Sequence, residues 1–209
     1  MLDILYFDSS LAVCVKPAGV LSEGLDERSM PYLLSLALKE RGIDGATPFV
    51  VHRLDKETSG LMVFALNSES AASLSSSVRN GDMKKIYQAL CVGRIDADSD
   101  VLCDLLFYDR ARSKSFVVDR ERKGVKRASL EYRVLERFED RTLVSVELHT
   151  GRTHQIRVQF SSRGHALCGD RRYGAPAEYG NRLCLCATSL SFSHTETGQQ
   201  MTFDIKRDF

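Results

Sequence analysis

This 209-residue sequence lacks most features that place a chain outside the ordinary globular proteins. It has no internal repeat, low-complexity tract or Gly/Ser-rich linker, which excludes collagen-like and disordered chains. Its apolar runs, such as residues 61–66, fall far short of the roughly 18 residues that a membrane-spanning helix needs. It also has neither type of Gly-rich nucleotide-binding loop. We therefore expect a folded domain with no membrane partner.

Acidic residues stand where an export signal needs basic ones. A secretory signal peptide begins with a positively charged region, but this N-terminus carries Asp3 and Asp8. The six cysteines show no C-x-x-C spacing, and disulfides persist mainly in oxidising compartments. We therefore expect a cytoplasmic protein with reduced thiols.

The charge is balanced in total but unevenly distributed. The chain is 43% hydrophobic and 27% charged with a net charge of +1, and a chain of this length can bury a core without disulfides or metal. Residues 110–173, however, hold 16 basic and 8 acidic side chains, which leaves the remainder net negative. This asymmetry is typical of a polyanion-binding face on an acidic protein, although solvated charge on loops and strand edges is the commoner explanation.

Apolar periodicity and turn residues predict the first elements. Residues 4–7 and 11–15 flank a polar turn and predict a β-hairpin. Ser29 as a cap, an early proline and apolar residues at helical spacing predict a helix over residues 30–41. Gly42 is expected to end this helix.

The rest of the chain is predicted to be mainly β. A second helix is expected to begin at Asn67 or Ser68 and to end before Asn80. Strands are expected at residues 49–51, 61–66, 84–94, 129–137, 141–149, 183–194 and 200–206. Residues 153–164 are ambiguous, because their apolar side chains fit a strand or a helix. Together these elements predict an α+β fold dominated by antiparallel sheet, in one catalytic-size domain covering residues 1–209.

The densest group of reactive side chains lies at residues 52–60, in a loop between two predicted strands. Loops held by rigid strands commonly carry catalytic groups. The carboxylate of Asp55 can serve as a nucleophile or general base. An ion pair with Arg53 or a turn-forming role is the more common use of such an aspartate.

A second polar cluster places Arg152, His154 and Arg157 within six residues. At the start of a possible helix, these groups suit phosphate binding or the clamping of a carboxylate. The alternative is a basic helix face paired with its own acidic neighbours. Neither cluster decides the function by itself.

Four motifs occur in order across about 160 residues of this chain. They are Lys16-Pro17-Ala18-Gly19; His52-Arg53-Leu54-Asp55 with Thr58-Ser59-Gly60-Leu61; Lys85 with Tyr87; and Gly151-Arg152-Thr153-His154-Gln155-Ile156-Arg157-Val158 with Gly164-His165, Gly169-Asp170, Tyr173 and Gly174. In these motifs the sequence resembles the RluA-type pseudouridine synthases. The resemblance implies their catalytic fold, a mixed, mainly antiparallel sheet with flanking helices and a central active-site cleft.

The resemblance also implies a reaction, the isomerisation of uridine to pseudouridine in RNA without a cofactor. The bond from ribose C1′ to uracil N1 breaks, the base turns, and C1′ joins C5. Asp55 is implied as the essential residue, and attack on C1′, addition to the ring and deprotonation of ribose all remain open. Arg157 is implied as the cation beside it, and Tyr87 as the ring that stacks on the uracil and can pass a proton at C5.

RNA contacts are expected from basic side chains. Arg53 is implied to fill the space of the flipped nucleotide or to bind its phosphate. Residues 110–127 are expected to form a phosphate-binding hairpin, with a solvated loop as the alternative. The predicted RNA-binding residues are Arg53, Arg112, Lys114, Lys123, Lys126, Arg152 and His154. The histidine spacings match no zinc pattern, so no metal is expected.

Two differences from the family pattern concern the end of the chain, where Cys186 and Thr195 replace a usual histidine and proline. We expect the first change to affect a local hydrogen bond on a buried strand and not the chemistry. No N-terminal S4 domain is expected, and neither is an oligomer. The sequence most resembles one branch of this family, and that resemblance implies uridines of the tRNA anticodon arm or of large-subunit rRNA as substrates.

Two other function classes remain open. One is a non-catalytic RNA-binding or RNA-folding factor with the same fold. The other is a hydrolase that cuts a glycosidic bond with paired carboxylates such as Asp55 and Asp170. Release of free uracil would distinguish the hydrolase from an isomerase.

Overall fold

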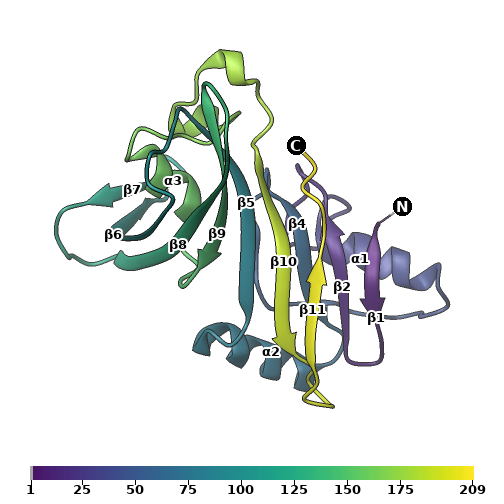
Figure 1. The fold of residues 1–209 in the computed structure, drawn as a ribbon. Coiled ribbons are helices and arrows are strands. Elements are labelled where there is room, and N and C mark those ends of the chain that lie inside the picture. Colours follow the sequence, from purple (N-terminus) through teal and green to yellow (C-terminus); the bar gives the residue numbers. More distant parts are fainter. Residues whose placement is uncertain (1) are drawn as a thin grey trace. The chain divides into compact units, whose positions relative to one another are not determined.

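The computed structural model describes residues 2–209, which form two compact units. The first unit runs up to Lys85 and takes in Ala187–Asp208, and the second comprises Ile86–Cys186 together with Phe209. The chain passes between them within the strands β5 (Lys84–Val92) and β10 (Leu185–Ser193). Each unit combines antiparallel strands with helices (Figure 1), which confirms the α+β class.

The first unit begins with the predicted hairpin. β1 (Ile4–Phe7) pairs antiparallel with β2 (Leu11–Lys16). Asp8 closes the turn, because its Oδ1 accepts the backbone N–H groups of Ser10 at 2.7 Å and Leu11 at 2.9 Å. The short aspartate side chain thus accepts two backbone N–H groups of the turn.

The sheet of the first unit runs in the order β1-β2-β4-β10 (Figure 1). β3 (Phe49–Val50) also pairs with β4 (Ser59–Ala65), and β11 (Gln200–Asp204) pairs with β10. Every residue of β4 is buried, which explains the continuous apolar run from Leu61 to Ala65. One core cluster contains Leu11, Val13, Leu61, Val63, Ala65, Leu74, Met83, Leu190 and Phe192.

Two helices belong to this unit. α2 (Ser68–Asn80) has the caps that the sequence predicts, because Asn67 accepts the N–H of Ser70 at 2.8 Å and Gly81 ends the helix in the left-handed conformation. α1 (Met30–Lys39) also begins where expected.

Ser29 is the N-cap residue of α1, as predicted, but its side chain does not cap the helix. The Ser29 hydroxyl makes no cap hydrogen bond and donates instead to the carbonyl oxygens of Gly24 and Asp26, at 3.0 and 2.7 Å. The serine therefore stabilises the bend before the helix rather than its first turn. The helix also ends at Lys39, two residues earlier than predicted.

The second unit contains a sheet in the order β5-β9-β8-β6-β7. Its pairs run antiparallel. The strands that complete it are β6 (Ser99–Asp109), β7 (Lys114–Val118), β8 (Val125–Arg137) and β9 (Arg141–Leu148). β6 lies outside the strands predicted from the sequence.

Helix α3 (Gln155–Ser161) settles the ambiguous segment in favour of a helix and packs against this sheet (Figure 1). Six of its seven residues are buried. A core cluster joins Val158 to Leu106, Ala128 and Tyr173. Two short 3-10 helices follow, η1 (Arg171–Tyr173) and η2 (Ala177–Tyr179).

The basic segment 110–127 does not form the single hairpin expected. β7 pairs with β6 and not with β8, because β6 lies between them. The basic residues therefore occupy two separate turns and the edge strand β7. A strand pairs with whichever neighbour matches its buried face, which charge alone does not reveal.

Two expectations from composition can be compared with residues 2–209. No helix in this part of the chain is long and apolar enough to cross a membrane. The six cysteines are all free, and Cys186 is buried on β10 as predicted.

Candidate active site

Asp55 lies on the connection between β3 and β4, in the first unit, and the backbone on both sides of it is held. The Ser22 hydroxyl donates to the Leu54 carbonyl at 2.7 Å and accepts the Leu54 N–H at 3.0 Å. The Thr58 N–H donates to the Asp55 carbonyl oxygen at 3.0 Å. Leu54 is buried. These bonds fix the backbone from which the Asp55 side chain projects.

Lys16 also supports this loop, a role that was not predicted from the sequence. Its fully buried ammonium group donates to the carbonyl oxygens of Lys56, Pro17 and Val20 at 3.0, 2.9 and 2.8 Å. Burial lowers the pKa of Lys16 to about 8, and the charges of Glu57 and Asp55 oppose that shift. The position of a lysine at the end of an otherwise apolar strand could have indicated this role.

His52 is a structural residue of this unit. Its Nε2 accepts the backbone N–H of Val63 at 3.1 Å, and its buried Nδ1 has no hydrogen-bond partner within the described chain. Burial lowers the pKa of His52 to about 3, with a smaller contribution from the positive charge of Lys85. The neutral imidazole therefore locks the loop to β4.

Gly60 follows this loop and allows two segments to approach closely. Its φ of +120° lies in the region that favours glycine, and a Cβ at this position would overlap the backbone of Ala187 on β10. The preceding Ser59 donates a 2.6 Å hydrogen bond to Asp208. Arg53, in contrast, is exposed and forms a 2.6 Å ion pair with Glu23.

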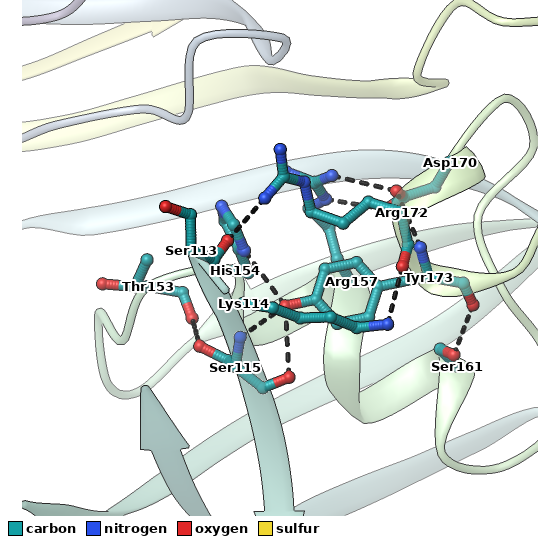
Figure 2. A network of polar contacts seen from close by, with 10 residues as sticks. All are labelled: Ser113, Lys114, Ser115, Thr153, His154, Arg157, Ser161, Asp170, Arg172 and Tyr173. Atoms are coloured by element: carbon teal, nitrogen blue, oxygen red, sulfur yellow. Dashed lines mark hydrogen bonds and ion pairs between the residues drawn. The ribbon is translucent and has the colours of Figure 1, made fainter. Parts of the chain in front are cut away.

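The other predicted catalytic residues belong to the second unit. Tyr87 is buried on β5 opposite Val146 of β9. Arg157 is buried in α3 and forms a two-point ion pair with Asp170: its Nε and Nη2 donate to the two carboxylate oxygens at 2.6 and 2.9 Å (Figure 2). Because both oxygens of Asp170 are engaged by a cation, its geometry is that of a charge partner and not of the proton donor that the hydrolase alternative needs.

Tyr173 brings three predicted site residues together, as Figure 2 shows. The Lys114 Nζ and the Arg157 Cζ lie 4.8 and 5.2 Å from the centre of its ring, and its hydroxyl lies 3.0 Å from His154 Nδ1. Burial raises the pKa of Tyr173 to about 12. No role was predicted for Tyr173 from the sequence, although it occurs in the last motif.

The remaining basic residues lie on the turns and strand ends of the second unit. Lys114 donates to the Arg172 carbonyl at 2.7 Å, and Arg172 donates to the Ser113 carbonyl at 2.7 Å, so the β6–β7 turn and η1 hold each other. Arg152 donates to the Arg127 carbonyl at 3.0 Å. The exposed residues of the predicted RNA-binding set here are Arg112, Lys123 and Lys126.

Within residues 2–209, no group of three or more His, Cys, Asp or Glu side chains is arranged to hold a metal ion. The predicted catalytic residues Asp55, Arg157 and Tyr87 carry a carboxylate, a guanidinium group and a phenol. Asp55 and Arg53 belong to the first unit, and the other predicted site residues belong to the second.

Comparisons with known proteins identify the family. Residues 10–162 match the RNA pseudouridylate synthase family. An uncharacterised RNA pseudouridine synthase of Aquifex aeolicus is 36% identical over 98% of this chain and 69% of its own length. The dual-specificity RNA pseudouridine synthase RluA of Haemophilus influenzae is 35% identical over 100% and 94%.

A solved structure agrees in fold. The human RNA pseudouridylate synthase domain containing 1 superposes with a TM-score of 0.82 over 100% of this chain and 84% of that one, at 22% identity. Because the family match spans most of the sequence, the chain belongs to the RluA-type RNA pseudouridine synthases, a family of isomerases.

Proposed function

We propose that this protein converts specific uridines in structured RNA to pseudouridine, with Asp55 as the essential residue. The observation that carries the proposal is the Asp55 loop, which lies within the matched family region and has its backbone pinned by Ser22 and Thr58. A carboxylate held in this way can act as a nucleophile or a base without first losing conformational freedom.

The proposed reaction conserves the mass of the RNA. The bond between uracil N1 and ribose C1′ breaks, the base turns in the site, and C5 forms the new bond to C1′. The proton on C5 is then lost and N1 gains one, so no cofactor or co-reactant is consumed. Such a reaction needs base-flipped substrate, since the glycosidic bond is inaccessible in a stacked helix.

Tyr87 and Arg157 are proposed as further catalytic residues. A buried phenol such as that of Tyr87 offers an aromatic face for stacking and a hydroxyl for proton transfer. Arg157 provides a buried permanent positive charge, which suits the stabilisation of an ionised carboxylate.

RNA binding is proposed to use the basic residues named above. The support is the excess of positive charge in residues 110–173 and the exposure of Arg112, Lys123 and Lys126. Phosphate neutralisation by such side chains supplies most of the sequence-independent affinity for RNA. Arg53 has an exposed acidic partner in Glu23, which an incoming phosphate can replace.

The substrate is proposed to be a tRNA anticodon arm, large-subunit rRNA, or both. The support is the resemblance to this branch of the family and the similarity to a relative named for dual specificity. We further propose that the chain acts as a monomeric, single catalytic domain in the cytoplasm.

The test is to incubate the purified protein with transcribed tRNAs and rRNA fragments and to map pseudouridine chemically. The wild-type protein is expected to modify a defined uridine, and Asp55→Asn is expected to lose the activity. Modification by Asp55→Asn at the wild-type rate, or no modification of any cellular RNA, would refute the proposal. Release of free uracil would point to the hydrolase, and complementation of a deletion strain by Asp55→Asn to the non-catalytic factor.

A further inference from the structure

We propose that Asp170 and Tyr173 are positioning residues that hold the Arg157 guanidinium group in one orientation. The inference rests on the proposed role of Arg157 in catalysis. It concerns residues of the second unit alone, and Figure 2 shows Arg157, Asp170 and Tyr173 together.

Asp170 grips one edge of the guanidinium group. The bonds from Nε and Nη2 to its two oxygens, at 2.6 and 2.9 Å, form a fork that fixes both the distance and the plane of the group. The pair is almost fully buried, with side-chain exposures of 4% for Arg157 and 1% for Asp170.

The Tyr173 ring restricts the movement of the Arg157 guanidinium group from one of its faces. The Arg157 Cζ lies 5.2 Å from the ring centre, within the range of a cation–π contact. The fork restricts the guanidinium group within its plane and the ring restricts movement out of it. Together the two contacts leave little freedom to a side chain that is otherwise long and flexible.

The two positioning residues are themselves held. Asp170 is the N-cap of η1 and accepts the N–H of Tyr173, and its own N–H donates to the Leu167 carbonyl at 2.9 Å. The preceding Gly169 has a φ of +76°, and a Cβ there would overlap the backbone of Arg182. Gly169 thus allows the close approach to Arg182, and the neighbouring Asp170 binds Arg157.

The Tyr173 hydroxyl ties this arrangement to the edge strand β7. It accepts the Ser115 N–H at 2.8 Å and lies 3.0 Å from His154 Nδ1. Ser115 in turn donates to the Thr153 carbonyl at 2.5 Å, just before α3. Arg157 is therefore oriented relative to both its own helix and the sheet.

The test compares Asp170→Asn, Tyr173→Leu and Tyr173→Phe in the full chain on an RNA that the wild-type protein modifies. Single-turnover rates are measured per folded protein, and RNA affinity is measured by fluorescence anisotropy. Asp170→Asn and Tyr173→Leu are expected to lower the rate by about 10–100-fold, the effect of a misplaced group. Tyr173→Phe keeps the ring and the Arg157–Asp170 ion pair and loses only the hydroxyl contacts with Ser115 and His154, so a smaller loss of about 2–10-fold is expected. RNA affinity is expected to stay unchanged in Asp170→Asn, which keeps the contacts of Tyr173 with the proposed RNA-binding residues Lys114 and His154.

Asp104→Asn is the matched control. Asp104 also pairs with an arginine next to the same helix, Arg163, at 2.9 Å, but it does not touch Arg157. This variant is expected to keep the wild-type rate.

A second readout does not depend on activity. The Nε–H of Arg157 is expected to be protected from solvent exchange in NMR spectra of the wild-type protein and to lose that protection in Asp170→Asn. Wild-type rates in Asp170→Asn and Tyr173→Leu, or losses in melting temperature without a loss in rate, would overturn the inference. An inactive wild-type protein would instead refute the proposed function.

Discussion

The Lys16 ammonium group donates to the Lys56 carbonyl oxygen across 3.0 Å, so the end of β2 is tied to the residue that follows Asp55. The Gly19 N–H donates to the same carbonyl at 2.7 Å. The first motif of the family thus supports the loop of the second through direct hydrogen bonds. This relationship explains why two motifs far apart in the sequence belong to one local structure.

Replacing Lys16 with Met is expected to destabilise the protein. The apolar side chain fills a similar volume but removes one donor from three carbonyl oxygens, of which that of Lys56 keeps the Gly19 N–H. An unsatisfied buried polar group costs about 1–3 kcal/mol of unfolding free energy. Denaturant unfolding measures the loss, and Lys39→Met, at an exposed lysine, is expected to change it by less than about 0.5 kcal/mol. Equal effects of the two changes would contradict this account.

Acid is expected to destabilise the first unit through His52. Its pKa is about 3 in the folded chain, below its usual 6.5, because it is buried. Between these values the unfolded chain binds a proton that the folded chain excludes. Lowering the pH from 6.5 towards 3 therefore reduces the unfolding free energy, by up to about 1.4 kcal/mol per pH unit.

His52→Gln provides the comparison for that pH dependence. The glutamine oxygen can accept the Val63 N–H but does not titrate. The difference in unfolding free energy between wild type and variant, measured by urea titration at several pH values, is expected to change steadily below pH 6.5. A constant difference would show that His52 is not the responsible group.

Gly60→Ala is expected to be far more harmful than Gly81→Ala. Both glycines have positive φ, +120° and +81°, but only at Gly60 would a Cβ meet backbone atoms, those of Ala187. The conformational cost alone is about 1–2 kcal/mol, and forcing the strands apart raises the total at Gly60 to roughly 2–5 kcal/mol. Thermal or urea unfolding of the two variants tests the order, which similar losses would contradict.

The double variant Lys123→Gln, Lys126→Gln is expected to weaken RNA binding without affecting the fold. Both lysines are exposed. Each phosphate contact that they make adds about 0.7–0.9 to the slope of log affinity against log salt concentration. The slope is therefore expected to fall by about 1–2, whereas Lys39→Gln in the first unit leaves it unchanged. A salt dependence equal to that of wild type would remove these two lysines from the binding surface.

Local structure could be predicted well from the sequence where short-range chemistry decides it. Asn67 and Gly81 mark the two ends of α2 because capping depends on groups within one helical turn. Asp8 closes the first hairpin for the same reason. Ser29 shows the limit, since its hydroxyl donates to the carbonyl oxygens of Asp26 and Gly24, in the bend before the helix, instead of capping the helix.

The sequence by itself determined the family, the order of its motifs and the choice of Asp55, Tyr87 and Arg157 as candidate catalytic residues, because these depend on residue type and spacing. The tertiary structure decided what depends on distant partners. It paired β7 with β6, placed Lys16 beneath the Asp55 loop, and assigned Asp170 and Tyr173 to Arg157. Such contacts follow from strand register and side-chain packing across many residues, and no local pattern in the sequence encodes them.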